Sequence, residues 1–234
     1  MTQEITTPRP TAPSATVQRA TKPTATLLAG GLVAGPLYLV AGLAQALTRD
    51  GFDLGRHALS LLENGPLGWI QIGNFLVAGL LSIACAVGLR RALAGGPGGT
   101  WGPRLVGVYG VGLMLAGVFR ADPTDGFPPG TPAGQGQVSW HGMLHLASFG
   151  VGFLCLIVAC FAVASGLVAL GRLRSALFSR LSGLAMLAGV AASFATAGTT
   201  TAVVAVWIAV VVAWAWLAVT AAGLRAQTSA ATPV

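Results

Sequence analysis

Three histidines, a serine and an aspartate are the side chains of this sequence best suited to chemistry. His141 and His145 are four residues apart, and Asp122 precedes them in a segment rich in proline and glycine. On a helix, residues at this spacing share one face about one turn apart, as do paired histidine ligands of a metal ion. His57 and Ser60 form a second closely spaced pair nearer the amino terminus. Brought together, these residues would make a metal-dependent or nucleophilic site.

Zinc is the metal that this set of residues favours. A catalytic zinc ion takes three protein ligands and keeps one position open for water. His57, His141 and His145 are the expected ligands, with Asp122 or Asp125 as alternatives to His57, and Asp122 could instead be a base. Ser60 would then be a nucleophile or an oxyanion donor. The resulting hypothesis is a zinc-dependent hydrolase that acts on a lipid at the outer leaflet.

Two other interpretations compete with the enzyme. A histidine at a membrane interface often hydrogen-bonds a loop carbonyl, and Asp122 before proline can close an Asx-turn. Asp122 or Asp125 can also pair with Arg120 or Arg56, which would fasten two loops together. The same polar face could instead recognise a lipid headgroup without chemistry. Structural support, ligand binding and catalysis therefore remain open.

The elements that must position these residues are hydrophobic helices. The chain of 234 residues is 54% hydrophobic and 8% charged, whereas soluble domains carry roughly 25% charged residues. A membrane span needs roughly 20 consecutive apolar residues. Six runs qualify, about 25–47, 69–89, 104–119, 140–166, 181–198 and 201–224. The sequence predicts an all-α integral membrane protein with a bundle of six transmembrane helices.

The two ends of the chain differ from this membrane domain, which is expected over 25–225. Residues 1–24 are rich in Thr, Pro and Ala and cannot bury enough apolar surface to offset the entropy of ordering. They are predicted to form a disordered tail, as are residues 226–234. A signal peptide is the competing interpretation of the amino end, but its apolar run exceeds the usual ~7–15 residues.

The distribution of Lys and Arg predicts the orientation of the bundle. Positively charged loops stay in the cytoplasm, and ten of the thirteen basic residues fall in the two tails and in the second and fourth loops. Both termini are therefore expected in the cytoplasm. The protein is expected to be a multi-pass protein of the plasma membrane. All three histidines and five of the six acids then lie outside.

Composition also excludes several classes of function. The net charge of +7 might suggest a nucleic-acid partner, but the basic residues flank apolar runs instead of clustering with aromatics. The sequence contains no phosphate-binding loop motif, so a nucleotide is not an expected ligand. Ion-coupled transporters keep ionisable residues inside their spans, and these six runs hold none well inside. Membrane lipids are the expected partners.

Three further residues belong to the expected outward end of the bundle. Asn74, near the start of the second span, is predicted to form hydrogen bonds between helices. Trp69 and Trp140 open the second and fourth spans, where aromatic rings suit the level of the lipid headgroups. We expect these residues to frame the polar face rather than to carry chemistry.

The chain resembles a bacterial family of multi-pass membrane proteins known as a domain of unknown function, DUF998. The resemblance covers roughly residues 30–220. It implies a membrane fold but no activity. The matching segments are His57-Ala-Leu-Ser60, Gly65-Pro-Leu-Gly-Trp-Ile-Gln-Ile-Gly-Asn-Phe75, Gly117-Val-Phe-Arg-Ala-Asp-Pro123, Gly126-Phe-Pro-Pro-Gly-Thr-Pro132 and His141-Gly-Met-Leu-His145.

A fainter chemical similarity connects the same residues to the alkaline ceramidases and progestin-receptor-like membrane hydrolases. Those proteins use a serine, an aspartate and three histidines around zinc, and the similarity implies the roles given above for Ser60, Asp122 and the three histidines. They have seven spans, and their His-xxx-His pair comes late in the chain. The similarity is therefore one of residue types.

Overall fold

Six long helices and one short 3-10 helix make up the protein in a computed structural model, which describes residues 22–134 and 136–229. Each of the six is long and apolar enough to cross a membrane, so the predicted all-α six-helix architecture is confirmed. The helices are α1 (Lys22–Thr48), η1 (Leu59–Glu63), α2 (Gly68–Ala92), α3 (Trp101–Val118), α4 (Trp140–Ala169), α5 (Leu173–Ala195) and α6 (Thr200–Ser229).

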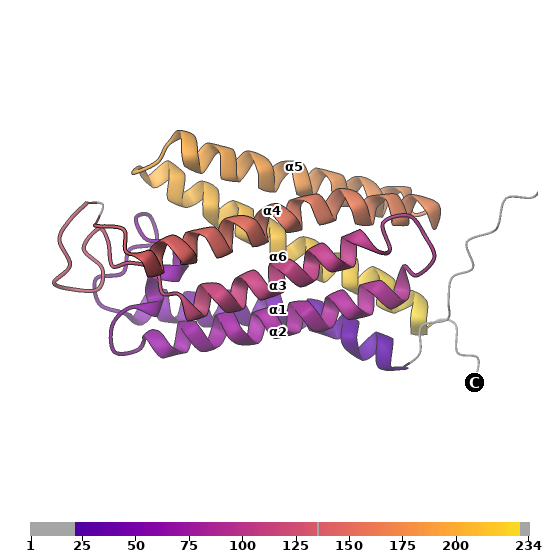
Figure 1. The fold of residues 1–234 in the computed structure, drawn as a ribbon, viewed down its shortest axis with the longest axis horizontal. Coiled ribbons are helices and arrows are strands. Elements are labelled where there is room, and N and C mark those ends of the chain that lie inside the picture. The colour runs from indigo at the N-terminus through magenta and orange to yellow at the C-terminus, as the bar shows by residue number, and fades with distance from the viewer. Residues whose placement is uncertain (1–21, 135, 230–234) are drawn as a thin grey trace, which may run out of the picture.

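The helices form a closed ring in chain order. Each long helix packs against the next one in the sequence, and α6 returns to pack against α1. The first residues of α1 and the last residues of α6 lie at the same end of the bundle (Figure 1). The opposite end carries η1 and the long segment between α3 and α4. We call it the loop end, and the other the basic end.

Close contacts between the helices depend on glycines, because glycine has no Cβ atom. A Cβ atom on Gly31 would stand 2.6 Å from the Cys85 sulfur of α2, and one on Gly35 would stand 2.8 Å from the Cβ of Trp214 on α6. Atoms this close overlap, so α1 needs glycine at both positions. Small residues four apart are typical of closely packed membrane helices.

The predicted boundary of the fifth span is wrong. That span was expected over 181–198, with Arg172, Arg174 and Arg180 in the preceding loop, but α5 begins at Leu173 and contains two of these arginines. An arginine near a helix end can extend its long side chain to the polar interface, so charge does not mark where the helix begins. The helix then ends at Ala195, before a turn with Gly198 at φ +80°.

The expected tails lie mostly outside the described residues. Residues 1–21 and 230–234 are not described. Helix α1 begins at Lys22, within the predicted tail of 1–24, and α6 continues to Ser229, past the expected end at 225. The 3-10 helix η1 lies in the first loop and begins at Leu59.

Candidate functional site

The first and third loops are joined at the loop end by one ion pair and one histidine. Arg56 Nη2 lies 3.0 Å from Asp125 Oδ1, and both side chains are partly exposed. The Arg56 guanidinium lowers the pKa of the Asp125 carboxyl below its ordinary value. His57 Nε2 lies 3.0 Å from the Asp125 carbonyl oxygen. The pairing of Arg56 with Asp125 makes a structural contact between loops that are far apart in sequence.

His57 is held on both of its ring nitrogens. The backbone N–H of Asp53 donates to Nδ1 at 2.9 Å, so Nδ1 carries no proton and Nε2–H is the donor to the Asp125 carbonyl. The side chain is 1% exposed and packs against the rings of Phe52 and Phe127. His57 therefore supports the loops, and neither nitrogen is directed to an open site.

Asp122 and Ser139 together fix the start of α4. Asp122 accepts hydrogen bonds from the Ser139 backbone N–H at 2.7 Å and from its hydroxyl at 2.6 Å. The Ser139 oxygen in turn accepts from the backbone N–H of Gly142 at 3.1 Å, as an N-cap does. A Cβ at Gly142 would collide with the Asp122 carboxylate. Both carboxylate oxygens of Asp122 are thus used by the helix cap.

His141 lies on the surface, apart from the other two histidines. Its ring stacks on that of Trp140, with 3.6 Å between centroids, and the residue is exposed. Trp140 and Trp69 are 63% and 68% exposed at the loop end of the bundle. These positions suit interfacial rings.

His145 points into the bundle, one turn along α4 from His141. Its Nδ1 lies 3.0 Å from the Ala116 carbonyl oxygen and 2.9 Å from that of Phe119, at the end of α3. Carbonyl oxygens only accept, so Nδ1 carries the proton. Glu63 Oε2 lies 3.5 Å from the same nitrogen. The histidine is 4% exposed and links α4 to α3 and η1.

Glu63 is the residue whose environment the sequence reasoning missed. It was counted among the outward-facing acids, but it is 1% exposed. One oxygen accepts from the Ala121 backbone N–H at 3.0 Å, and the other has no hydrogen-bond partner among the described residues. Burial raises the pKa of the carboxyl to about 8, so it is mostly protonated at neutral pH. Its position directly after Leu61 and Leu62 was the available signal.

A network of buried amide side chains lies between α1 and α2. Asn74 donates to the Tyr38 carbonyl oxygen at 3.0 Å, which confirms the predicted bond between helices. Gln45 and Asn74 both donate to Gln71 Oε1, at 3.0 Å and 3.2 Å. Gln45 Oε1, Gln71 Nε2 and Asn74 Oδ1 have no hydrogen-bond partner in the described part of the chain. The bonds that do form link α1 to α2, as polar side chains do between membrane helices.

The three histidines do not come together. His57 belongs to the loop contact, His141 lies on the surface and His145 is buried against α3, as described above. Across residues 22–134 and 136–229, no group of three or more His, Cys, Asp or Glu side chains is arranged to hold a metal ion. The geometry that the zinc hypothesis needs is not formed by these side chains.

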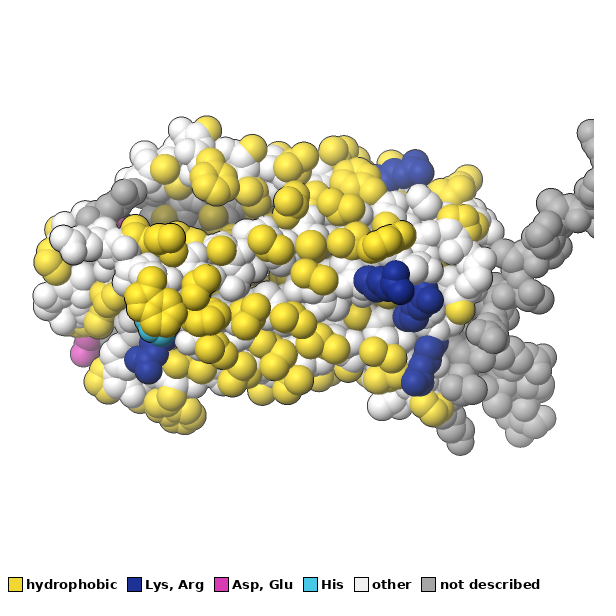
Figure 2. All heavy atoms as spheres, in the orientation of Figure 1, with side chains coloured by type: hydrophobic (Ala, Val, Ile, Leu, Met, Phe, Trp, Pro, Cys, Tyr) yellow, Lys and Arg dark blue, Asp and Glu magenta, His cyan; other side chains and the backbone are white. Residues whose placement is uncertain are grey.

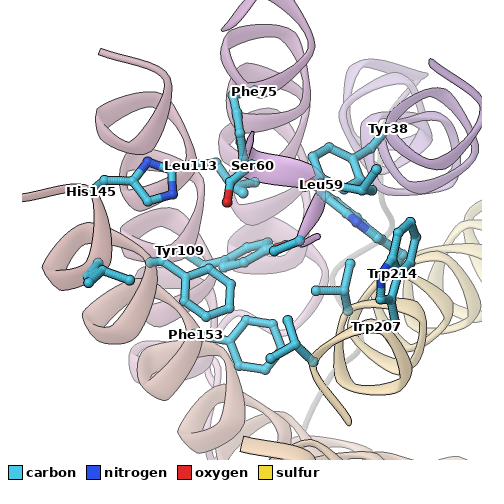
Figure 3. Close-up of a pocket in the computed structure, with 15 residues that line it drawn as sticks. Tyr38, Leu59, Ser60, Phe75, Tyr109, Leu113, His145, Phe153, Trp207 and Trp214 are labelled. Atoms are coloured by element: carbon cyan, nitrogen blue, oxygen red, sulfur yellow. The ribbon is translucent and has the colours of Figure 1, made fainter. Parts of the chain in front are cut away.

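A cavity of about 180 Å³ lies inside the helix ring, below the loop end. Aromatic rings from α1, α3, α4 and α6 form its walls, with Tyr38 and Trp214 5.2 Å apart between centroids. His145 and Ser60 lie on its loop-end side (Figure 3). Its lining is almost wholly apolar and contains no Lys, Arg, Asp or Glu. Two of the predicted site residues thus meet at one cavity.

The cavity opens sideways because α5 leaves the bundle. All buried residues of α5 lie between Ala176 and Met186, near the basic end, where Ser179 donates to the Cys160 carbonyl oxygen of α4 at 2.7 Å. Towards the loop end, Gly189 of α5 faces Ala205 and Ala209 of α6. The surface is hollowed between α4 and the pair α5–α6 in this region (Figure 2). This hollow lies on the side of the bundle, between helices.

These features define an integral membrane protein of six helices. Its apolar cavity lies beneath the first and third loops, which are joined by contacts between their side chains. The chain belongs to the family described as "Protein of unknown function (DUF998)", which matches residues 32–223. The resemblance expected from the sequence is confirmed. No curated protein and no solved structure matches the chain.

The residues that form the cavity could hardly be recognised from the sequence. Tyr38, Tyr109, Phe153 and Trp214 lie within apolar runs, where an aromatic residue is ordinarily a core residue. Arg120, considered as an ion-pair partner, is exposed. Asp125 forms its ion pair with Arg56.

Proposed function

We propose that this protein binds a membrane lipid by admitting part of an acyl chain into the cavity from the side. The observation that carries the proposal is the apolar cavity beside the hollow between α4 and the pair α5–α6. A cavity of about 180 Å³ is smaller than the ~300–1,000 Å³ of pockets that enclose a whole drug-sized ligand. It is similar to a ~150 Å³ apolar cavity that takes up benzene. One chain segment fits inside while the rest of the lipid stays in the bilayer.

The zinc-dependent hydrolase is the less favoured candidate. Its ligands would be His57, His141 and His145, but His57 is engaged on both nitrogens and His141 stacks on a surface ring. Asp122, its candidate base, caps α4 through both oxygens. No specific contact brings these groups to a shared point, so binding accounts for the geometry better than metal-dependent chemistry.

The proposal places the loop end outside the cytoplasm, so that the cavity opens to the outer leaflet. Arginine side chains gather at the basic end in Figure 2, as cytoplasmic ends of membrane proteins do. A cysteine in place of Gln137, exposed at the loop end, is expected to react with a membrane-impermeant maleimide in intact cells. A cysteine in place of Ala94, exposed at the basic end, is expected to react only after lysis. The reverse pattern would contradict the orientation.

Filling the cavity tests lipid binding directly. Val210 lines the cavity from α6, and its neighbour Val211 is 45% exposed on the outer face. After reconstitution with phosphatidylcholine that carries a photoreactive group in its acyl chain, mass spectrometry is expected to find adducts on cavity-wall residues such as Tyr109 and Phe153. Val210→Trp should abolish these adducts because the indole occupies the space.

The matched control is Val211→Trp, which adds the same side chain one residue away. It should leave the adducts on the cavity walls unchanged. If the walls remain unlabelled in the native protein while the outer helix faces are labelled, no acyl chain enters and the proposal fails. Labelling that survives Val210→Trp would contradict it equally.

A further inference from the structure

The polar atoms at the loop-end side of the cavity have defined hydrogen-bonding roles. His145 Nδ1 carries the ring proton because it faces the carbonyl oxygens of Ala116 and Phe119. In a neutral imidazole the other nitrogen, Nε2, is then an acceptor. Figure 3 shows the far side of this ring directed towards Ser60. The cavity therefore presents an acceptor held in one tautomer by backbone atoms.

Ser60 adds a hydroxyl beside this acceptor. Its side-chain oxygen points into the space between His145 and Leu59 in Figure 3, and all three residues line the cavity. A hydroxyl can donate one hydrogen bond and also accept. A ligand group that both donates to His145 Nε2 and accepts from Ser60 would satisfy both residues, and an alcohol is the simplest such group.

The surroundings disfavour a charged group at this point. The cavity lining holds no cationic side chain that could compensate a phosphate or carboxylate, and removing an unpaired charge from water is very costly. A cationic group would find no carboxylate in the lining either. Glu63 lies behind the histidine, 3.5 Å from Nδ1, and not on the cavity side. Its pKa is raised to about 8 by burial, so it supplies little negative charge at neutral pH.

We infer that the cavity selects an uncharged, hydroxyl-bearing amphiphile, with the hydroxyl donating to His145 Nε2 and accepting from Ser60 while its chain occupies the apolar space. This inference rests on the proposed function, because it concerns the same cavity. It adds the chemical class of the ligand. His145 and Ser60 are the recognition residues, and the walls formed by Tyr109, Phe153 and Trp214 hold the chain.

The test compares two photoreactive probes of one chain length, 1-hexadecanol and its methyl ether. The ether keeps the oxygen but has no proton to donate. The native protein is studied in nanodiscs of phosphatidylcholine, a lipid without a hydroxyl donor. One neutral hydrogen bond changes a binding constant by roughly twofold to tenfold, so the alcohol is expected to label the cavity walls at about a twofold to tenfold lower concentration than the ether.

His145→Asn isolates the recognition atom. The asparagine amide can still donate to the carbonyl of Phe119 but places no acceptor where Nε2 lies, so the two probes should label this variant equally. His141→Asn changes the exposed histidine of the same helix and should keep the preference for the alcohol. Ser60→Ala should reduce that preference without removing it.

The possible outcomes distinguish the inference that the cavity selects a hydroxyl from the proposed function of lipid binding. Equal labelling of the native cavity by alcohol and ether would overturn the selection of a hydroxyl while leaving chain binding intact. A preference that persists in His145→Asn would show that another group recognises the alcohol, and the inference would again be wrong. If neither probe nor the photoreactive phosphatidylcholine labels the cavity walls, the proposed function itself fails.

Discussion

Replacing Phe127 with alanine is expected to lower the free energy of unfolding by about 3–5 kcal/mol, the usual cost of removing a buried phenylalanine. Phe127 is fully buried in the third loop. Its ring meets that of Phe52 edge to face at 5.1 Å, and the Arg49 guanidinium lies over it at 5.0 Å. This single side chain therefore fills the space between the first and third loops.

Thermal or chemical unfolding of the purified protein in detergent measures this effect. Phe194→Ala is the matched control, because Phe194 is 80% exposed on α5 and its removal leaves no internal space unfilled. Phe127→Leu keeps most of the apolar volume and should cost less than Phe127→Ala. Equal stability of the Phe127 and Phe194 alanine variants would show that the packing of the first loop against the third does not depend on this ring.

The second large effect concerns pH and Glu63. Burial raises the pKa of this carboxyl from 4.5 to about 8. Between these values the folded protein retains a proton that the unfolded chain has released, so stability falls as pH rises. The contribution is fully present below about pH 4.5 and is lost as pH passes 8, with a slope approaching about 1.4 kcal/mol per pH unit.

Glu63→Gln should remove this slope, since glutamine resembles the protonated acid and does not titrate. The measurement is the free energy of unfolding at several pH values between 5 and 8. The groups facing Glu63 are His145, whose Nδ1 is 3.5 Å away, and Arg120, which lowers the pKa of the carboxyl. His145→Asn with Glu63 intact serves as control and should retain the slope. An unchanged slope in Glu63→Gln would show that another group titrates.

The glycine-dependent contacts and the capped helix could be predicted because they depend on local sequence. Apolar length identified all six helices, and Ser139 has the residue type and the position, just before an apolar run, that favour the N-cap it forms. Gly31 and Gly35 have the four-residue spacing typical of close helix contacts, and they lie where α1 meets α2 and α6. In each case, residues adjacent along the chain determine the structure.

The spatial grouping of the polar residues was harder to predict from the sequence, because it depends on which segments of the chain contact one another. His141 and His145 were treated as one pair on a helix face, yet one stacks on Trp140 and the other is buried against α3. Hydrophobic length cannot distinguish a histidine that faces lipid or solvent from one that faces another helix. Packing decides that assignment.

By itself, the sequence determined that this protein is a bundle of six membrane helices of the DUF998 family, because the hydrocarbon core of a bilayer requires long apolar segments whatever their arrangement. Only the tertiary structure decided that Glu63 is buried, that Ser60 and His145 share a cavity, and that α5 leaves an opening beside them. Those features depend on contacts between distant segments and on the direction of one helix. Neither has a signature in residues that are neighbours along the chain.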